Sequence, residues 1–348
     1  MDAALGRATP DDRWLSAWES ADWVAARVMF AVSAAVPRTI RYADSMALRL
    51  ERAGADSGTT VADGWIAWHW RARGRYDEWI EHRRRDYLYN WPQRGGAMMD
   101  NTAMDAAFLR SALYLGAPQD AQVAMIVGRM RRIVDGDSSP APSAGVSGLA
   151  HCWLAQWRLA HGDTTGVGRA VAYLRDLDGR DRAGLLDGLP TRARWEVCPA
   201  LLEALAARIG GRGALNRARA LDRLLRPMPI PRRTLSDAVD GSATHDQTRL
   251  FLENLLAARL LASAGDTAGA LAAVRRRPWD VVMLDVFEMP NEYLRLEGRL
   301  AAAVADTVGA VAAYQHYLGL RPEPPVHPPW RAEWDSVRRE LAALRPRS

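Results

Sequence analysis

The chain has 348 residues, of which 49% are hydrophobic and 25% are charged, and its formal net charge is +5. This composition is typical of a folded globular protein, and the length allows one large helical array or two ordinary domains. All 46 cationic residues are arginine. The sequence therefore excludes the P-loop, protein-kinase and Schiff-base chemistries, because each of these depends on a lysine side chain.

The first residues do not resemble a signal peptide, because residues 1–13 carry three Asp and no apolar core. The longest early apolar run, Val28–Val36, is too short to span a bilayer. We therefore expect a cytoplasmic protein without a membrane span. The exclusive use of arginine and the abundance of alanine further suggest a GC-rich bacterial coding sequence.

Helical periodicity dominates the chain and strand patterns are nearly absent, so the sequence predicts an all-α fold. Gly, Pro and Asp-Thr punctuation divides the helical segments into pairs. The pairs are expected at residues 11–35 and 38–54, 59–73 and 76–90, 100–115 and 118–134, 147–160 and 164–177, 193–209 and 213–226, 245–264 and 267–277, and 291–304 and 307–320, followed by a closing helix at 330–344.

Two of these pairs repeat one sequence. Ala262–Val274 reads ASAGDTAGALAAV and Ala302–Tyr314 reads AAVADTVGAVAAY, and the turn Gly162-Asp163-Thr164 is a third copy. In each copy a small residue ends the first helix and Asp or Thr caps the second. Because one helix pair cannot bury its own apolar face, we expect successive pairs to stack.

The spacing of small, aromatic and proline residues resembles that of tetratricopeptide repeats. The matching positions are Leu294, Gly298, Ala310, Tyr314 and Pro322, with Ala258, Gly265 and Ala270 in the same columns one repeat earlier. Tyr293–Leu344 is also similar to the closing segment of helical-repeat regions behind bacterial serine/threonine kinases and activator-type transcription regulators. This resemblance implies a right-handed α-solenoid of about seven tetratricopeptide-like helix pairs with a C-terminal capping helix, in a signalling or transcription context.

We expect one continuous array in three stretches. Residues 1–134 form the N-terminal helical-repeat segment, residues 147–226 the central repeats, and residues 245–344 the C-terminal repeats with the capping helix.

Three connections interrupt the predicted helices. Residues 135–145 and 226–246 are rich in Pro, Ser and Asp, and the second is long enough to be a mobile lid or a hinge. Residues 321–329 (RPEPPVHPP) should form a stiff extended bridge, because proline is incompatible with a helix interior.

Helical-repeat arrays usually bind a partner along the concave face made by the first helix of each pair. Equivalent solvent-side positions of this face are predicted at Trp68, Arg110, Gln156, Arg259 and Arg299, with Arg71 and Arg295 a turn away. Arginines pair bidentately with carboxylates, so this row suits an acidic peptide or a C-terminal carboxylate. The alternative is that exposed helix faces of an all-arginine protein carry arginine in any case.

The sequence thus predicts a non-enzymatic protein-recognition scaffold or regulatory module, with no cofactor and no metal. A nucleic-acid-binding regulator is the alternative, acting through arginine clusters at residues 83–85, 129–132, 217–223 and 275–277. An enzyme is a third interpretation, although no pair of carboxylates has the spacing of a general acid and base.

Two further groups are interpreted as packing. Cys152 and Cys198 are expected to be small buried residues at a repeat interface, in preference to metal ligands or reactive thiols. The clustered tryptophans, among them Trp68, Trp70 and Trp79, are expected to fill the gaps between stacked helices.

Overall fold

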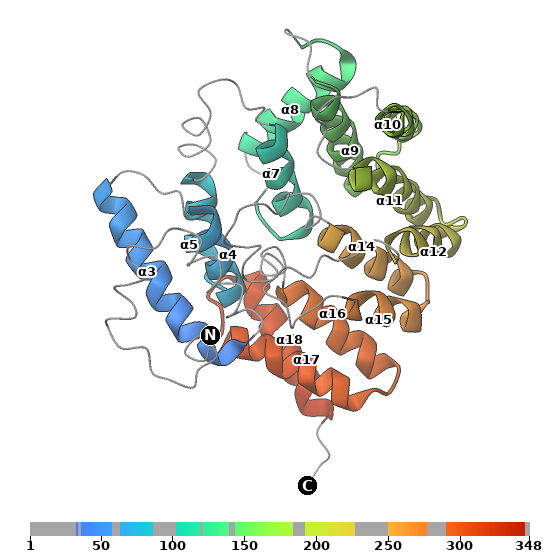
Figure 1. Ribbon diagram of the computed structural model, residues 1–348. Coiled ribbons are helices and arrows are strands. Elements are labelled where there is room, and N and C mark those ends of the chain that lie inside the picture. Colours follow the sequence, from blue (N-terminus) through green and yellow to red (C-terminus); the bar gives the residue numbers. More distant parts are fainter. Residues whose placement is uncertain are drawn as a thin grey trace. The chain divides into compact units, whose positions relative to one another are not determined.

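A computed structural model describes eight stretches of the chain and a single residue, Ser33. The stretches are 36–57, 63–85, 102–118, 121–138, 143–183, 192–226, 250–276 and 290–344, where 143–183 and 192–226 are the longest internal ones. Over these residues the chain is helical and contains no strand, which confirms the all-α prediction (Figure 1). None of their helices has the length and apolar character needed to cross a membrane.

The helices of these stretches lie within a few residues of the predicted ones. They are η1 (Pro37–Thr39), α3 (Ile40–Ser57), α4 (Asp63–Arg73), α5 (Tyr76–Arg85), α7 (Thr102–Tyr114), α8 (Ala121–Asp135), α9 (Ala144–Ala160), α10 (Val167–Arg182), α11 (Arg192–Gly210), α12 (Ala214–Leu225), α14 (Leu250–Ser263), α15 (Thr267–Arg275), α16 (Pro290–Ala303), α17 (Thr307–Leu320) and α18 (Pro328–Leu344). The helix predicted at 11–35 and the lid predicted at 226–246 fall almost entirely outside the described residues.

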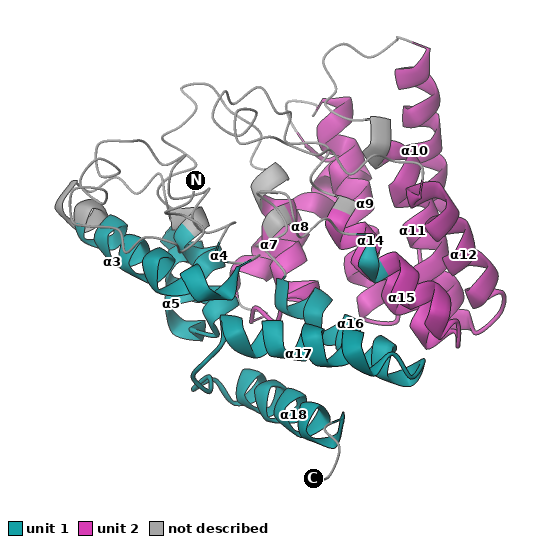
Figure 2. Cartoon of the chain, turned by 60° about the horizontal axis from the view of Figure 1, so that its bottom comes forward, with its two compact units in different colours: residues 1–94, 230–243, 274–348 teal, residues 95–229, 244–273 magenta. Residues whose placement is uncertain are grey.

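Contacts divide the chain into two compact units (Figure 2). Unit 1 comprises residues 1–94, 230–243 and 274–348, and unit 2 comprises residues 95–229 and 244–273. The units do not coincide with the three expected stretches, because the beginning of the chain groups with its end.

Unit 2 stacks successive helix pairs. α9 packs on α7, α8 and α10, and α11 packs on α9, α10, α12 and α14. Leu154, Leu174 and Leu202 are buried in these contacts, and Asn254 Nδ2 of α14 donates a hydrogen bond of 2.8 Å to the Ala273 carbonyl of α15. Packing of each helix against its neighbours along the chain is the arrangement that the repeat logic predicts.

The turn inside a pair has one geometry in its three sequence copies. The N–H of the Asp that ends the turn donates to the carbonyl five residues before it, at 2.9 Å in Asp163→Arg158, Asp266→Leu261 and Asp306→Ala301. The residue before this Asp takes a left-handed conformation, with φ of 78° at Gly162, 86° at Gly265 and 63° at Ala305. A helix commonly ends in this way, and glycine is favoured there because it lacks a Cβ.

In two of the three copies the Asp of the turn also caps the next helix, whereas α10 begins after Gly166 without a side-chain cap. Asp266 accepts the N–H of Gly269 and Asp306 accepts the N–H of Gly309, each at 3.0 Å. In unit 2, Arg219 Nε of α12 donates to the same Asp266 carboxylate at 2.9 Å. The repeated Asp-Thr therefore begins α15 and α17, as the sequence predicts.

Replacing Ala305 by glycine should stabilise unit 1. An L-residue with a Cβ is disfavoured in the left-handed region, so Ala305→Gly should raise the free energy of unfolding by about 0.5–1 kcal/mol. Ala312→Gly, at an exposed position inside α17, should lower it by about 1 kcal/mol. Urea unfolding of the two variants checks both signs, and a loss of stability in Ala305→Gly would contradict the geometry of the turn.

Unit 1 joins segments that are far apart in the sequence. Asn291 Nδ2 of α16 donates to the Ala72 carbonyl of α4 at 3.2 Å, and Arg321 Nε donates to the same carbonyl at 3.1 Å. Arg73 Nη1 donates to the Leu320 carbonyl at 2.7 Å. A linear array predicts contacts between neighbouring pairs alone, so the packing of α4 against the last pair was not expected.

Aromatic rings and guanidinium groups fill this contact. The rings of Trp79 and Trp330 lie 5.4 Å apart, and the guanidinium groups of Arg71 and Arg321 lie 5.9 Å and 5.0 Å from the centre of the Trp330 ring. Trp79 is fully buried, and Trp68 and Trp70 are nearly so. This confirms that the described members of the tryptophan cluster are core residues.

The two cysteines form a disulfide. Cys152 of α9 and Cys198 of α11 lie with their Cα atoms 6.2 Å apart, and the bond links positions separated by 46 residues. Their burial between neighbouring pairs was predicted correctly, but their pairing was not. Helical periodicity shows which face of a helix is buried and leaves open which residue of the next helix it meets.

Candidate functional site

The first helices of the pairs in unit 2 form one layer. α9 packs on α7 and on α11, and α11 packs on α14. The second helices bridge this layer, because α8 contacts α7 and α9, α10 contacts α9 and α11, and α12 contacts α11 and α14 (Figure 1). We call the face of α7, α9, α11 and α14 that is turned away from α8, α10 and α12 the inner layer.

Three predicted site residues lie on the first helices of unit 2: Arg110 on α7, Gln156 on α9 and Arg259 on α14. The Tyr114 hydroxyl of α7 donates to Gln156 Oε1 at 2.8 Å and so connects α7 to α9. Arg110 shares the face of Tyr114, because the two are four residues apart on one helix. Arg110 and Arg259 are half-buried.

The electrostatics of Tyr114 connect the remaining helices to this site. Burial raises the pKa of the Tyr114 hydroxyl, and the negative charge of Glu253 raises it further, whereas Arg208 and Arg259 oppose the shift. Tyr114 therefore lies within electrostatic range of groups on α11 and α14. Tyr114, Arg208 and Glu253 were not predicted from the sequence, although the position of Tyr114 one turn after Arg110 could have revealed it.

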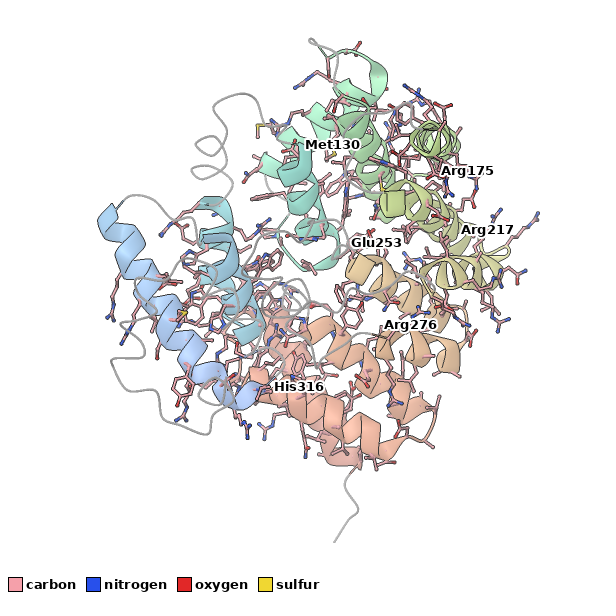
Figure 3. All side chains as sticks on the ribbon, in the orientation of Figure 1. Met130, Arg175, Arg217, Glu253, Arg276 and His316 are labelled. Carbon is pink, nitrogen blue, oxygen red and sulfur yellow. A yellow bond between two sulfur atoms is a disulfide. The ribbon has the colours of Figure 1, made fainter. Side chains whose placement is uncertain are left out.

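Charged side chains of unit 2 lie on two opposite sides of its stacked helices. Arg175 and Arg217 point outward from α10 and α12, whereas Glu253 lies on the side of α14 toward α7 and α9 (Figure 3). Arg175 Nη2 and Arg217 Nη1 donate to the two carboxylate oxygens of Glu203, at 2.6 Å and 2.8 Å. The outer arginines thus tie α10, α11 and α12 together.

The predicted row is wrong about exposure at several positions. Trp68 and Gln156 were expected on the solvent side but are 4% and 2% exposed, and Arg71 is 1% exposed. The Arg83 guanidinium lies 5.0 Å from the centre of the Trp68 ring, and Arg71 forms an ion pair with Glu292. Periodicity could not show this, because Glu292 comes from a segment more than 200 residues away.

The row members on α16 are paired with the capping helix. Arg295 Nη1 donates to Glu333 Oε2 at 2.6 Å, and Arg299 Nη2 donates to Glu340 Oε1 at 2.8 Å. Glu333 and Glu340 lie on α18, which also buries Trp334 and Val337 in the core of unit 1. Arg295 and Arg299 therefore form ion pairs with acidic side chains of α18 in the same chain.

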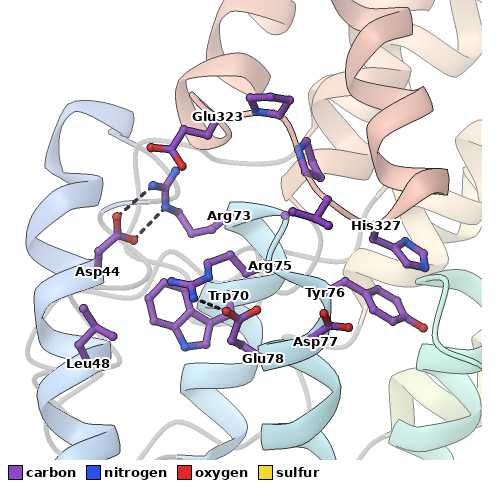
Figure 4. Close-up of a pocket in the computed structure, with 14 residues that line it drawn as sticks. Asp44, Leu48, Trp70, Arg73, Arg75, Tyr76, Asp77, Glu78, Glu323 and His327 are labelled. Atoms are coloured by element: carbon purple, nitrogen blue, oxygen red, sulfur yellow. Dashed lines mark hydrogen bonds and ion pairs between the residues drawn. The ribbon is translucent and has the colours of Figure 1, made fainter.

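A cleft of about 480 Å³ lies in unit 1 between α3, the turn from α4 to α5 and the extended bridge before α18 (Figure 4). Arg73 donates to both carboxylate oxygens of Asp44, at 2.8 Å and 3.0 Å. The Arg75 guanidinium lies 4.6 Å from the centre of the Trp70 ring and pairs with Glu78.

The far end of the cleft is aromatic. Tyr76 and His327 stack with ring centroids 3.7 Å apart, and burial lowers the pKa of the His327 imidazole. The stack of Tyr76 on His327 connects α5 to the extended bridge, so contacts across the cleft hold these segments together. The residues that line this cleft bring together no nucleophile and base with the geometry of a catalytic pair.

Several members of the arginine clusters form ion pairs within the chain. Arg129 of α8 donates to both oxygens of the buried Asp105 of α7, each at 2.6 Å. Arg217 and Arg219 pair with Glu203 and Asp266. These contacts favour a structural role over a surface of unpaired positive charge.

Among the described residues, no three His, Cys, Asp or Glu side chains gather as a metal site. Comparisons with protein-family models, with curated protein sequences and with solved structures find no match to this chain.

The Glu340 carboxylate should make the stability of unit 1 sensitive to acid. Burial would raise its pKa, but hydrogen bonds from Arg299, Tyr314 and Ser336 outweigh burial and lower the pKa to about 2. A group whose pKa is lower in the folded state stabilises the fold above its unfolded pKa, and this contribution disappears as the pH falls from about 4.5 to about 2.

Urea unfolding at several pH values in this range checks the effect. Glu340→Gln should make the stability fall less steeply as the pH decreases, because its side chain cannot be protonated. Glu323→Gln, which changes an exposed carboxyl on the bridge, should leave the slope unchanged. Equal slopes in wild type and Glu340→Gln would show that this network does not stabilise unit 1.

Proposed function

We propose that the chain is a tetratricopeptide-like, non-enzymatic recognition module that binds an acidic peptide or protein segment on the inner layer of unit 2. The supporting observation is that Arg110, Gln156 and Arg259, selected from the sequence as one row, belong to first helices of stacked pairs. Tyr114 connects them, through its hydrogen bond to Gln156 and its electrostatic coupling to Arg259.

The ion pairs of the row members in unit 1 support an acidic ligand. Arg71, Arg295 and Arg299 bind Glu292, Glu333 and Glu340 of their own unit. These pairs also show what the arginines of such a row can hold, namely carboxylates presented by a neighbouring helix. An external acidic segment would offer the same groups to Arg110 and Arg259.

Stacked helices make this binding favourable for a physical reason. Each first helix packs on at least two other helices of unit 2, so its side chains start from a nearly fixed backbone. A preorganised surface loses little conformational entropy when it binds a peptide, and guanidinium–carboxylate pairs then supply orientation. A regulatory or scaffolding role in bacterial signalling or transcription is the setting that the resemblance of the C-terminal repeats implies.

The test is selection of ligands from a displayed library of random peptides with free C-terminal carboxylates. We expect acidic sequences to be enriched. Arg110→Glu with Arg259→Glu should lower the affinity for the selected peptide by at least about tenfold, since each charge-assisted pair contributes roughly 1.5–3 kcal/mol.

Arg132→Glu with Arg223→Glu is the matched control. It makes the same change of charge at exposed positions of α8 and α12, outside the inner layer, and should leave the affinity within about twofold. Equal losses in the two double variants would contradict the proposed surface. Tight binding of oligonucleotides that falls steeply with salt would instead support the nucleic-acid alternative.

A further inference from the structure

The disulfide joins α9 and α11, two of the helices that form the inner layer of unit 2. Gln156 follows Cys152 by one turn of α9, and its Nε2 donates to the Cys152 sulfur at 3.3 Å. The opposite end of the same amide accepts the Tyr114 hydroxyl at 2.8 Å. One continuous chain of contacts thus runs from Cys198 on α11 through Cys152 and Gln156 on α9 to Tyr114 on α7.

The interface around the disulfide has no spare room. Gly148 precedes Cys152 by one turn, and a Cβ at Gly148 would collide with the rings of Trp195 and with Leu177. Trp195 in turn precedes Cys198 by about one turn of α11 and is 2% exposed. α9 and α11 therefore approach each other closely at the position where the disulfide joins them.

Loss of the disulfide should disturb this arrangement. Two thiol sulfurs cannot remain at bonding distance, so the reduced side chains need more space than the interface offers. Either α9 and α11 shift, or Cys152 turns away from Gln156. In both cases the amide of Gln156 loses its support, and the position of Tyr114 in the inner layer is no longer fixed.

We infer that the Cys152–Cys198 disulfide holds Gln156 and Tyr114 of the inner layer in the positions needed for binding. The oxidised chain is then the form that recognises the acidic partner. This inference rests on the proposed function and adds its redox requirement. Gln156 acts as a positioning residue, because it transmits the geometry of the disulfide to Tyr114.

The bond forms by exchange with a protein or small-molecule disulfide. Cys152 and Cys198 give up two electrons and two protons, and the partner disulfide is reduced to two thiols as the new S–S bond forms. With both sulfurs in residues that are at most 5% exposed, the folded chain resists attack by external thiols. Disulfides persist in oxidising compartments, so the proposal favours such a compartment over the cytoplasm for the working form.

The experiment compares the oxidised full chain with the chain unfolded and refolded in a dithiol. Circular dichroism first establishes that the reduced chain is helical. Affinity for the selected acidic peptide should then fall about three- to tenfold on reduction, the size expected for losing one or two hydrogen bonds. Unchanged affinity in a folded, fully reduced chain would overturn the inference.

A readout without the peptide separates this inference from the proposed function. Hydrogen exchange of the backbone should become faster in α7, α9 and α11 on reduction, whereas α16, α17 and α18 should exchange as before. Faster exchange together with no peptide binding in either form would refute the proposed function alone. Identical exchange in both forms would refute the role of the disulfide.

The variant Gln156→Met tests the inference even if the reduced chain fails to fold, because it keeps the disulfide. This substitution keeps the volume and the disulfide but removes the hydrogen bonds to Cys152 and Tyr114. We expect this substitution to lower the affinity for the peptide about as much as reduction does, in the absence of any reductant. Binding as tight as wild type would show that Gln156 does not transmit the geometry of the disulfide. Thiols of the native wild-type chain that react with maleimide without prior reduction would also overturn the inference.

Discussion

The architecture of unit 2 depends on the fact that a helix pair cannot bury its apolar face by itself. Each pair must therefore pack on the next, as α9 does on α7 and α11. Once this stacking is in place, the first helices lie side by side and polar residues at equivalent positions come together. The Tyr114–Gln156 contact is a product of this constraint, because it joins residues 42 positions apart that have no local reason to meet.

Local features of the fold could be predicted from the sequence, and long-range contacts could not. The turns before Asp266 and Asp306 have recognisable chemistry, since a helix end, a left-handed residue and a capping carboxylate all lie within a few residues. The burial of Arg71 depends on α16 and α18, which periodicity cannot place beside α4. The partner of Cys152 likewise depended on how two helices face each other. The same limitation explains the candidate site: a row of equivalent positions was predictable, but not which of its members would be buried.

The two units use arginine in different ways. In unit 1, α18 brings its own carboxylates to Arg295 and Arg299, and these pairs hold the capping helix against the last repeat. Arginine in unit 1 also stacks on tryptophan rings, as Arg321 does on Trp330. The planar guanidinium group suits this contact better than a lysine ammonium group does. In unit 2, the outer arginines bind Glu203, and Tyr114 interacts electrostatically with Glu253, Arg208 and Arg259.

The location of a bound ligand tests the account most directly. An acidic peptide with a photoreactive group beside its C-terminal carboxylate can be cross-linked to the full oxidised chain, and the attached residues can be identified by mass spectrometry. We predict attachment on α7, α9 and α14 of unit 2, close to Tyr114. Attachment confined to α8, α10 and α12, or to helices of unit 1, would contradict it.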